Sequence, residues 1–248
     1  MNQVIETILN HRSIRKFKEE KLSSDQVQTI VEAAQQASSS SNVMAYSIIG
    51  VTDQSLKNEL YGISGHSHVK NNGHLFVFCG DLHRIHQLAQ DHPNKDIEEN
   101  MESTEQFIVA TVDAALAAQN AAIASESMGL GICYIGSLRN DINRLNELLK
   151  LPEHVIPLFG LAVGYPDQNP EIKPRLPLKA IYHENQYLPF SEQQAHITTY
   201  DNEMQNYYGS RSSNTKVDTW TDQMLRKYSK PTRMDVTPFI KSKNLNKR

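Results

Sequence analysis

A stretch of small side chains between Ser103 and Met128 constrains the fold of this chain more than any other feature. Its centre, Ala110–Ala124, is mainly alanine and carries a single charged residue, Asp113. Alanine is the strongest helix former, and Gly129 is a typical residue just past a helix end. A helix that is small nearly all the way round has little polar surface to present to water. We therefore predict a central, closely packed helix, either in a monomer core or at a homodimer seam.

Composition limits the class of protein. The 248 residues suffice for one large domain or two small ones, and 39% hydrophobic with 21% charged residues is ordinary for a soluble globular protein. No uninterrupted apolar run approaches the ~18 residues of a membrane span, and the start lacks the basic-then-apolar layout of a secretory signal. Cys79 and Cys133 lie in apolar strand-like runs, which favours free thiols in a reducing compartment. We expect a cytoplasmic protein.

The charge is unevenly spread. From Leu225 onward there are eight basic residues and one acid, which leaves 17 basic and 27 acidic residues before that point. A body this acidic repels nucleic acid, so we expect no nucleic-acid partner. The basic tail is interpreted as a solvated C-terminal helix, with attraction of a phosphorylated small molecule as the alternative.

Hydrophobic periodicity predicts interleaved helices and strands. Ser23 and Gln26 form a capping-box pattern before one helix, and amphipathic spacing indicates several more. The predicted helices are 4–9, a second that begins at this capping box and ends in the serine run 38–41, and then 103–128, 142–149, 192–208 and 219–228. The predicted strands are 47–51, 75–79, 132–135 and 155–163. A loop is expected at 62–68. No linker divides the chain, so we predict one α+β domain over 1–248 with a helical extension from about residue 185.

One basic loop, His11–Phe17, gathers a histidine, a hydroxyl and three cations between two predicted helices. Guanidinium forks and hydroxyls suit a phosphate or another planar anionic group. A solvated basic loop is the alternative. The anionic-ligand hypothesis gains support from three other polar segments: the serine run 38–41, the segment 134–140, and the loop 173–177.

Several tempting motifs fail. Gly129, Gly131 and Gly136 resemble a dinucleotide fingerprint, but the last interval is wrong and the glycines follow a helix and enter a strand. The pairs His66/His68 and His83/His86 have no cysteine or carboxylate at ligand spacing, so we interpret them as scattered surface histidines and predict no metal. No nucleophile elbow or Walker loop occurs. The chemistry is therefore expected to reside in a cofactor.

Taken in order, these segments closely resemble the flavin-dependent nitroreductase family, in its NADPH-preferring branch of oxygen-insensitive nitroreductases and flavin reductases. The resemblance covers nearly the whole chain and rests on the segments 11–15, 38–41, 134–140, 158–160, 173–177, 207–211 and 218–220. It implies a mostly antiparallel central sheet flanked by helices, in an interlocked homodimer that binds FMN at the subunit interface.

The resemblance also implies residue roles. His11 and Ser13, with Lys173 and Arg175, would hold the FMN phosphate, while Arg12 would brace the loop and Arg15 would face the pyrimidine edge of the flavin. Ser38, Ser39 and Ser40 would contact the phosphate and ribityl side from the partner subunit. Tyr134, Ile135, Gly136 and Ser137 would run along one ring face. Arg211 and Lys216 would bind NADPH. No side chain is expected to be catalytic, because flavin N5 carries the chemistry.

Three residues depart from the family pattern. His66, at a predicted FMN-binding position, stands where a glutamine beside the flavin is usual. Met44 follows the serine run in place of another glutamine, and Lys216 replaces an arginine. Lysine keeps the charge but loses the planar fork.

The function expected from the resemblance is a ping-pong cycle. Hydride passes from NADPH through the flavin to nitroaromatics, quinones, free flavin or azo compounds. The alternative is a flavin-binding carrier or redox sensor with incidental turnover. The physiological acceptor is not predicted.

Overall fold

A four-stranded antiparallel sheet forms the centre of the fold. The computed structural model describes residues 2–92, 95–211 and 215–248. The strands are β1 (Tyr46–Val51), β2 (His74–Asp81), β3 (Gly131–Ile135) and β4 (Val155–Gly164), in the spatial order β1-β2-β4-β3. Every neighbouring pair is antiparallel. Each strand lies where the apolar runs predicted it, which confirms the α+β class and the antiparallel sheet.

Helices cover both faces of the sheet, because alternate side chains of β2 pack against helices on opposite sides. Phe76 and Phe78 pack on one side with α2 (Ser24–Gln35) and α6 (Thr104–Ser127). Leu75 and Val77 pack on the other with α3 (Gln54–Ser64) and α7 (Ile142–Leu149). Successive strand residues point to opposite faces, so a strand covered on both sides reads as a continuous apolar run. All eight residues of β2 are buried.

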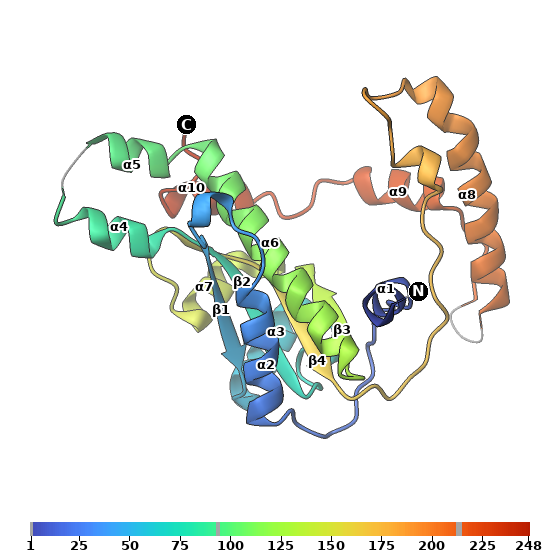
Figure 1. The fold of residues 1–248 in the computed structure, drawn as a ribbon, viewed down its shortest axis with the longest axis horizontal. Helices are drawn as coiled ribbons and strands as arrows, with labels where there is room; N and C mark the ends of the chain where they lie inside the picture. The colour runs from blue at the N-terminus through green and yellow to red at the C-terminus, as the bar shows by residue number, and fades with distance from the viewer. Residues whose placement is uncertain (1, 93–94, 212–214) are drawn as a thin grey trace. The chain divides into compact units, whose positions relative to one another are not determined.

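The alanine-rich helix is α6, the long green helix of Figure 1. Ser103 caps its start by accepting a hydrogen bond from the Gln106 N–H, and the helix ends before Gly129, as predicted. Six of its alanines are almost fully buried in the core clusters on either part of the helix: Ala110, Ala114, Ala117, Ala118, Ala121 and Ala122. Small side chains let the helix axis approach the sheet closely.

Among the described residues, α6 is the one helix long and apolar enough by length and composition to cross a membrane. Core helices of soluble proteins meet the same criterion, and one face of α6 packs on the sheet. We interpret it as a core helix.

Two other helices at the amino-terminal end follow their local signals. α1 spans Gln3–Leu9, with the Asn2 side chain accepting from the Ile5 N–H. The capping box predicted for α2 is present, because Ser23 accepts from the Gln26 N–H and the Gln26 side chain accepts from the Ser23 N–H.

The prediction of a loop at 62–68 is wrong in its first part. Helix α3 continues through Ser64 and ends at Gly65, whose φ of 71° suits glycine, and a short 3₁₀ turn follows at Ser67–Val69. Reading 62–68 as a glycine- and histidine-rich loop missed this helix, whose buried side, with Leu60, packs on the sheet. His68 is only 6% exposed, so its interpretation as a surface histidine is also wrong.

Three short helices complete this part of the chain. α4 (His83–Ala89) and α5 (Lys95–Met101) were not predicted, whereas α10 (Val236–Ser242) lies in the basic tail that was predicted to form a helix. α10 buries Phe239 and Ile240 against Ala110 and Ala114 of α6. The basic tail is therefore not simply a solvated helix. Lys243 is buried and donates to the Leu151 carbonyl, and Lys247 pairs with Glu102 at 3.0 Å.

The chain divides into two compact units. The first comprises residues 1–170 and 233–248, and the second comprises 171–232. The second contains a 3₁₀ turn (Leu178–Ala180), α8 (Phe190–Ser210) and α9 (Trp220–Tyr228), close to the two predicted helices. Its small core is Tyr200, Met204 and Tyr208, with Trp220 packed against it. One domain over 1–248 with an extension from about residue 185 stays a prediction.

Candidate functional site

The basic loop is attached to the edge strand β3. Ser13 pairs with Ile132 in a parallel bridge, and the Ile14 N–H donates to the Ile132 carbonyl at 2.8 Å. Ile14 itself is buried, and a Cβ added to Gly131 would lie 2.6 Å from its Cγ1. Glycine at 131 therefore permits this close approach, which brings the loop 11–17 alongside the strand that leads into 134–137.

Arg15 acts electrostatically on both sides of this junction. Burial lowers the pKa of His68 to about 4, with smaller contributions from the charges of His66 and Arg15. Burial raises the pKa of the Cys133 thiol, and Arg15 opposes that rise. The rings of His66 and His68 stack with centroids 5.3 Å apart. The fold thus brings Arg15, His66 and β3, which are far apart in sequence, into one region.

His11 already has a partner within the protein. Its Nδ1 lies 2.7 Å from Glu126 Oε1, at the end of α6. Glu126 also contributes, after burial, to raising the pKa of Tyr134, whose ring contacts Phe159 edge-on at 5.6 Å. A phosphate bound by His11 would compete with this carboxylate. The role of His11 as a phosphate ligand stays a prediction.

Arg12 is half-buried, directly before the residues that bridge to β3. It lines a cleft of about 350 Å³ together with Asn10, Glu126 and Gly131. The predicted role of Arg12 in bracing the loop stays a prediction.

The serine run is held by a buried carboxylate that sequence analysis did not assign. Asp113, fully buried on α6, accepts from the Ser39 hydroxyl at 3.0 Å and from the Ser40 N–H at 2.9 Å. It also accepts from the Ala45 N–H at 3.1 Å. These bonds fix a loop in which Ser41 and Met44 both have positive φ, near 50°. The available signal was one charge within the alanine-rich run.

A cationic group lies beside Gly136 and Ser137. From the position that a Cβ on Gly136 would occupy, Arg139 Nη2 is 3.5 Å away and Arg233 Nη1 is 3.8 Å away. Arg233 donates to Asn140 Oδ1 at 3.0 Å, and Arg139 donates to the Leu158 carbonyl. Burial, then the charge of Arg233, lowers the pKa of Arg139. Sequence reasoning missed Arg233, because it lies almost a hundred residues away from Gly136.

The residues of this region fit an anionic, aromatic cofactor such as FMN. The Ser137 hydroxyl is buried and has no hydrogen-bond partner among the described residues. Buried polar groups are normally paired, so a ligand atom would satisfy it. The two guanidinium groups at Gly136 and the nearby charge of Arg15 supply fixed cations. This donor set suits a ring system that gains negative charge on reduction.

In the second unit, three predicted residues gather around one tyrosine. Lys173 Nζ, Arg211 Cζ and Lys216 Nζ lie 5.7, 5.9 and 4.3 Å from the centroid of the Tyr208 ring. Arg175 instead folds back and donates to the Lys173 carbonyl at 2.8 Å. Lys173 was assigned to FMN, whereas Arg211 and Lys216 were assigned to NADPH. The structure places Lys173 beside the two residues that were predicted to bind NADPH.

Lys216 and Arg211 differ in whether other side chains already occupy their hydrogen-bond donors. Lys216 pairs with Asp218 at 2.8 Å, and Arg226 pairs with the same carboxylate at 2.7 Å. The Arg211 Nε is buried and has no partner among the described residues. Lys173 and Arg175 belong to the second unit and His11 and Ser13 to the first, so their convergence on one phosphate stays a prediction.

Comparison with known proteins covers the whole chain. The model of the nitroreductase family matches residues 8–165, and that of the nitroreductase family C-terminal domain matches residues 173–248. An FMN reductase (NADPH) of Bacillus subtilis is 49% identical over 249 residues, all of both chains. An NADPH-dependent oxidoreductase of Staphylococcus aureus is 42% identical over 250 residues, covering 100% of this chain and 99% of the relative.

Solved structures agree with these matches. The NfrA1 nitroreductase of B. subtilis superposes with a TM-score of 0.95 at 48% identity, covering 99% of this chain and 100% of that one. The NADPH:FMN oxidoreductase of Vibrio harveyi, complexed with NAD⁺, gives a TM-score of 0.86 at 41% identity over the full length of both chains.

Proposed function

Because this chain belongs to the nitroreductase family, as the sequence resemblance predicted, we propose that it is an FMN-dependent oxidoreductase that takes electrons from NADPH. The observation that carries the proposal is the junction of the basic loop with β3. There Arg15 follows the residues that pair with β3 and acts on the Cys133 thiol, two arginines lie beside Gly136, and the Ser137 hydroxyl has no partner among the described residues. The relatives' names, which pair FMN with NADPH, support the same cofactor and donor.

Each residue has a defined task in this proposal. Arg15 balances negative charge on the pyrimidine edge of the flavin, and Ser137 donates its unpaired hydroxyl to it. Asp113 holds Ser39 and Ser40 in position for the phosphate and ribityl side. When bound, FMN supplies two-electron redox chemistry that no side chain of this protein can provide. The protein's contribution is orientation and electrostatic tuning.

NADPH recognition is assigned to the cations around Tyr208. A phosphate prefers several charge-assisted donors, and the Arg211 Nε has no hydrogen-bond partner within the described part of the chain. Lys216 supplies a point charge, not a fork, and Asp218 competes for it. Preference for NADPH over NADH is therefore expected to depend more on Arg211 than on Lys216.

The reaction is expected to follow a ping-pong order, in which NADPH leaves before the electron acceptor enters the same site. Nitroaromatics, quinones, free flavin and azo compounds are the proposed acceptors. Arg139 and Arg233 at Gly136 favour acceptors that carry, or develop, negative charge.

A homodimer is part of the proposal. Ile108, Val112 and Leu116 lie at four-residue intervals along α6 and are 41–49% exposed. Such spacing places them on one face of the helix. Helix α1, which also contacts α6, leaves Val4 and Leu9 more than half exposed. A second copy of the chain would cover this apolar surface, and FMN is expected at that interface.

Anaerobic titration of the purified flavoprotein with NADPH tests the activity. Bleaching of bound FMN, followed by repeated turnover with a quinone or nitro acceptor and parallel double-reciprocal plots, is expected. A flavin carrier or redox sensor would bleach once and stall. FMN that NADPH does not bleach would refute the oxidoreductase assignment.

Replacement of Arg15 tests the site itself. Arg15→Ala is expected to weaken FMN retention or slow its reduction. Lys18→Ala is the matched control, since Lys18 is exposed on the same segment and its backbone bond to Tyr165 is unaffected. Equal flavin content and equal reduction rates in both variants would remove Arg15 from the site.

A further inference from the structure

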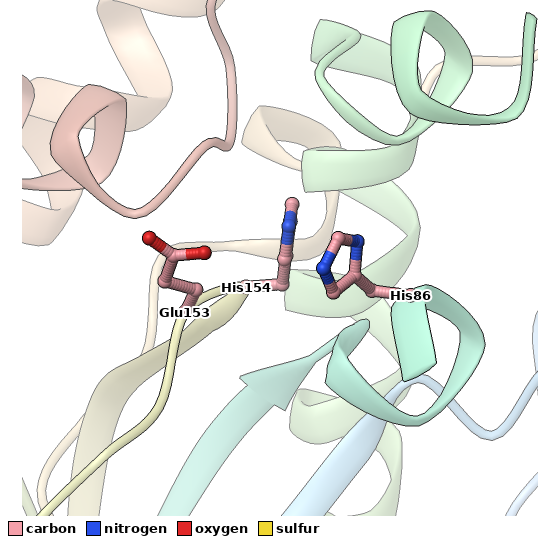
Figure 2. A group of neighbouring side chains, drawn as sticks. All are labelled: His86, Glu153 and His154. Carbon is pink, nitrogen blue, oxygen red and sulfur yellow. The ribbon is translucent and has the colours of Figure 1, made fainter. Parts of the chain in front are cut away.

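Two histidines and a glutamate that are separated in sequence meet at the end of the sheet. His86 is on α4, and Glu153 and His154 directly precede β4. One potential ligand atom from each residue lies within 4.8 Å of the others. Figure 2 shows the His154 ring between the His86 ring and the Glu153 carboxylate. No carboxylate stands at ligand spacing from His86 in the sequence, which is why this cluster was not predicted.

The backbone around the cluster is firmly held. The Leu82 N–H, just before α4, donates to the His154 carbonyl at 3.0 Å, and the His154 N–H donates to the Lys243 carbonyl at 3.0 Å. His83 Nδ1 lies 3.1 Å from the Glu153 carbonyl. The start of α4, the start of β4 and the end of α10 are therefore joined, and the ligand-bearing side chains share a fixed framework.

Two ring nitrogens in this cluster lack partners. The Nδ1 atoms of His86 and His154 are both buried and make no hydrogen bond to any described residue. His154 is 4% exposed, and the two rings lie 4.3 Å apart, centroid to centroid. Unpaired buried polar atoms are uncommon because their desolvation is not compensated. Two such imidazole nitrogens in neighbouring rings would both be satisfied by a ligand that accepts their lone pairs.

We propose that His86, Glu153 and His154 form a binding site for a zinc ion, with water as the fourth ligand. Imidazole nitrogens together with one carboxylate oxygen suit Zn²⁺, whereas Mg²⁺ and Ca²⁺ prefer oxygen ligands. The site is separate from the proposed flavin site, since none of its three residues is assigned there. Its occupancy would link α4 to the start of β4.

Metal binding requires a modest closure of the cluster. Bonds of about 2.0–2.1 Å in a tetrahedral site place ligand atoms roughly 3.4 Å apart, less than the present 4.8 Å limit. Glu153 is exposed and His86 half-buried, so both can move toward the buried His154. Burial lowers the pKa of His154, with His86, His83 and Lys247 acting in the same direction and Glu153 opposing, and the neutral imidazole is the ligating form.

The test uses the full-length, FMN-loaded protein titrated with zinc chloride against a chromophoric chelator, with magnesium chloride in parallel. The variants are His86→Gln, Glu153→Gln and His154→Asn. Asparagine tolerates the φ of 60° at position 154. His196→Gln, in the second unit, is the matched control for nonspecific binding by histidine.

One zinc per chain is expected for the wild type and the control, with a rise in melting temperature that magnesium does not produce. Each ligand variant is expected to lose affinity by about tenfold or more. If His154→Asn does not fold, His86→Gln decides, because His86 is only half-buried. No zinc binding by the wild type, or equal affinity in His86→Gln and His196→Gln, would overturn the proposal. Flavin bleaching by NADPH is measured separately, so failure of the zinc site and failure of the oxidoreductase assignment are distinguishable.

Discussion

Asp113 offers a sharp test of how the alanine-rich helix organises the serine run. Its Oδ2 accepts from both the Ser39 hydroxyl and the Ala45 N–H, and its Oδ1 accepts from the Ser40 N–H. In Asp113→Asn the amide can present only one oxygen. With that oxygen at the Oδ2 position, the Ser40 N–H faces an NH₂ group; with it at Oδ1, both other donors lose their acceptor.

The expected loss of stability in Asp113→Asn follows from the number of hydrogen-bond donors left without an acceptor. Ser39 cannot simply turn away, because its oxygen also accepts from the Met44 N–H at 2.7 Å. The better amide orientation therefore leaves one donor unpaired, and an unsatisfied buried donor costs about 1–3 kcal/mol. At a central value of about 2 kcal/mol, the melting temperature of a chain this long falls by about 4–8 °C. Asp113→Ala, which leaves three donors unpaired, should lower the stability further.

The assay combines two measurements at fixed protein concentration. Urea unfolding of the apoprotein gives the free energy, and FMN titration of the folded variant gives the affinity for the cofactor. We expect Asp113→Asn to lower both, because the serine loop loses the bond that fixes Ser40. Asp167→Asn is the control, since Asp167 is exposed and its backbone N–H, which the substitution keeps, donates to the Lys16 carbonyl. Equal unfolding free energies in the two variants would refute the reasoning.

Two further predictions concern the sheet. Gly131→Ala should destabilise the protein by about 1–3 kcal/mol, because the added methyl group overpacks against Ile14. Gly62→Ala is the control in α3: its Cβ would meet no atom within 4 Å, so stability should stay unchanged or rise. Urea unfolding of both variants measures the two free energies. Burial, then the charge of Lys57, lowers the pKa of His74 to about 4, so the unfolded chain takes up its proton near 6.5, before the folded chain does. Stability is therefore expected to fall as the pH drops from 6.5 through 4, and less so in His74→Leu; parallel pH profiles would contradict this.

The fold was largely predictable because most elements carry their own local signal. Four apolar runs became the four strands, and the capping box at Ser23 opened α2 as expected. Hydrophobic periodicity gave wrong predictions where only a few residues of a helix are buried. α3 was missed because Gly62 and Gly65 made its end read as a loop. The burial of α10, in the predicted tail helix, was missed because its short apolar segment with Phe239 lies among basic residues.

The candidate site was predictable only in part. The family resemblance was confirmed, and the basic loop that it named lies alongside β3, where Ser13 pairs with Ile132. Arg233 and Asp113 were missed, since each acts on a segment more than sixty residues away. Periodicity and spacing describe neighbours along the chain, and they carry no information about such contacts.

The sequence by itself determined the class of the protein: an α+β fold around an alanine-rich helix, with the ordered motifs of the nitroreductase family. These features are local, because helix propensity, strand burial and motif order are written in consecutive residues. Only the tertiary structure decided how side chains combine. It paired His11 with Glu126, gathered Lys173, Arg211 and Lys216 at Tyr208, and brought His86 to His154. Antiparallel pairing and helix packing fix those distances, and neither can be read from spacing along the chain.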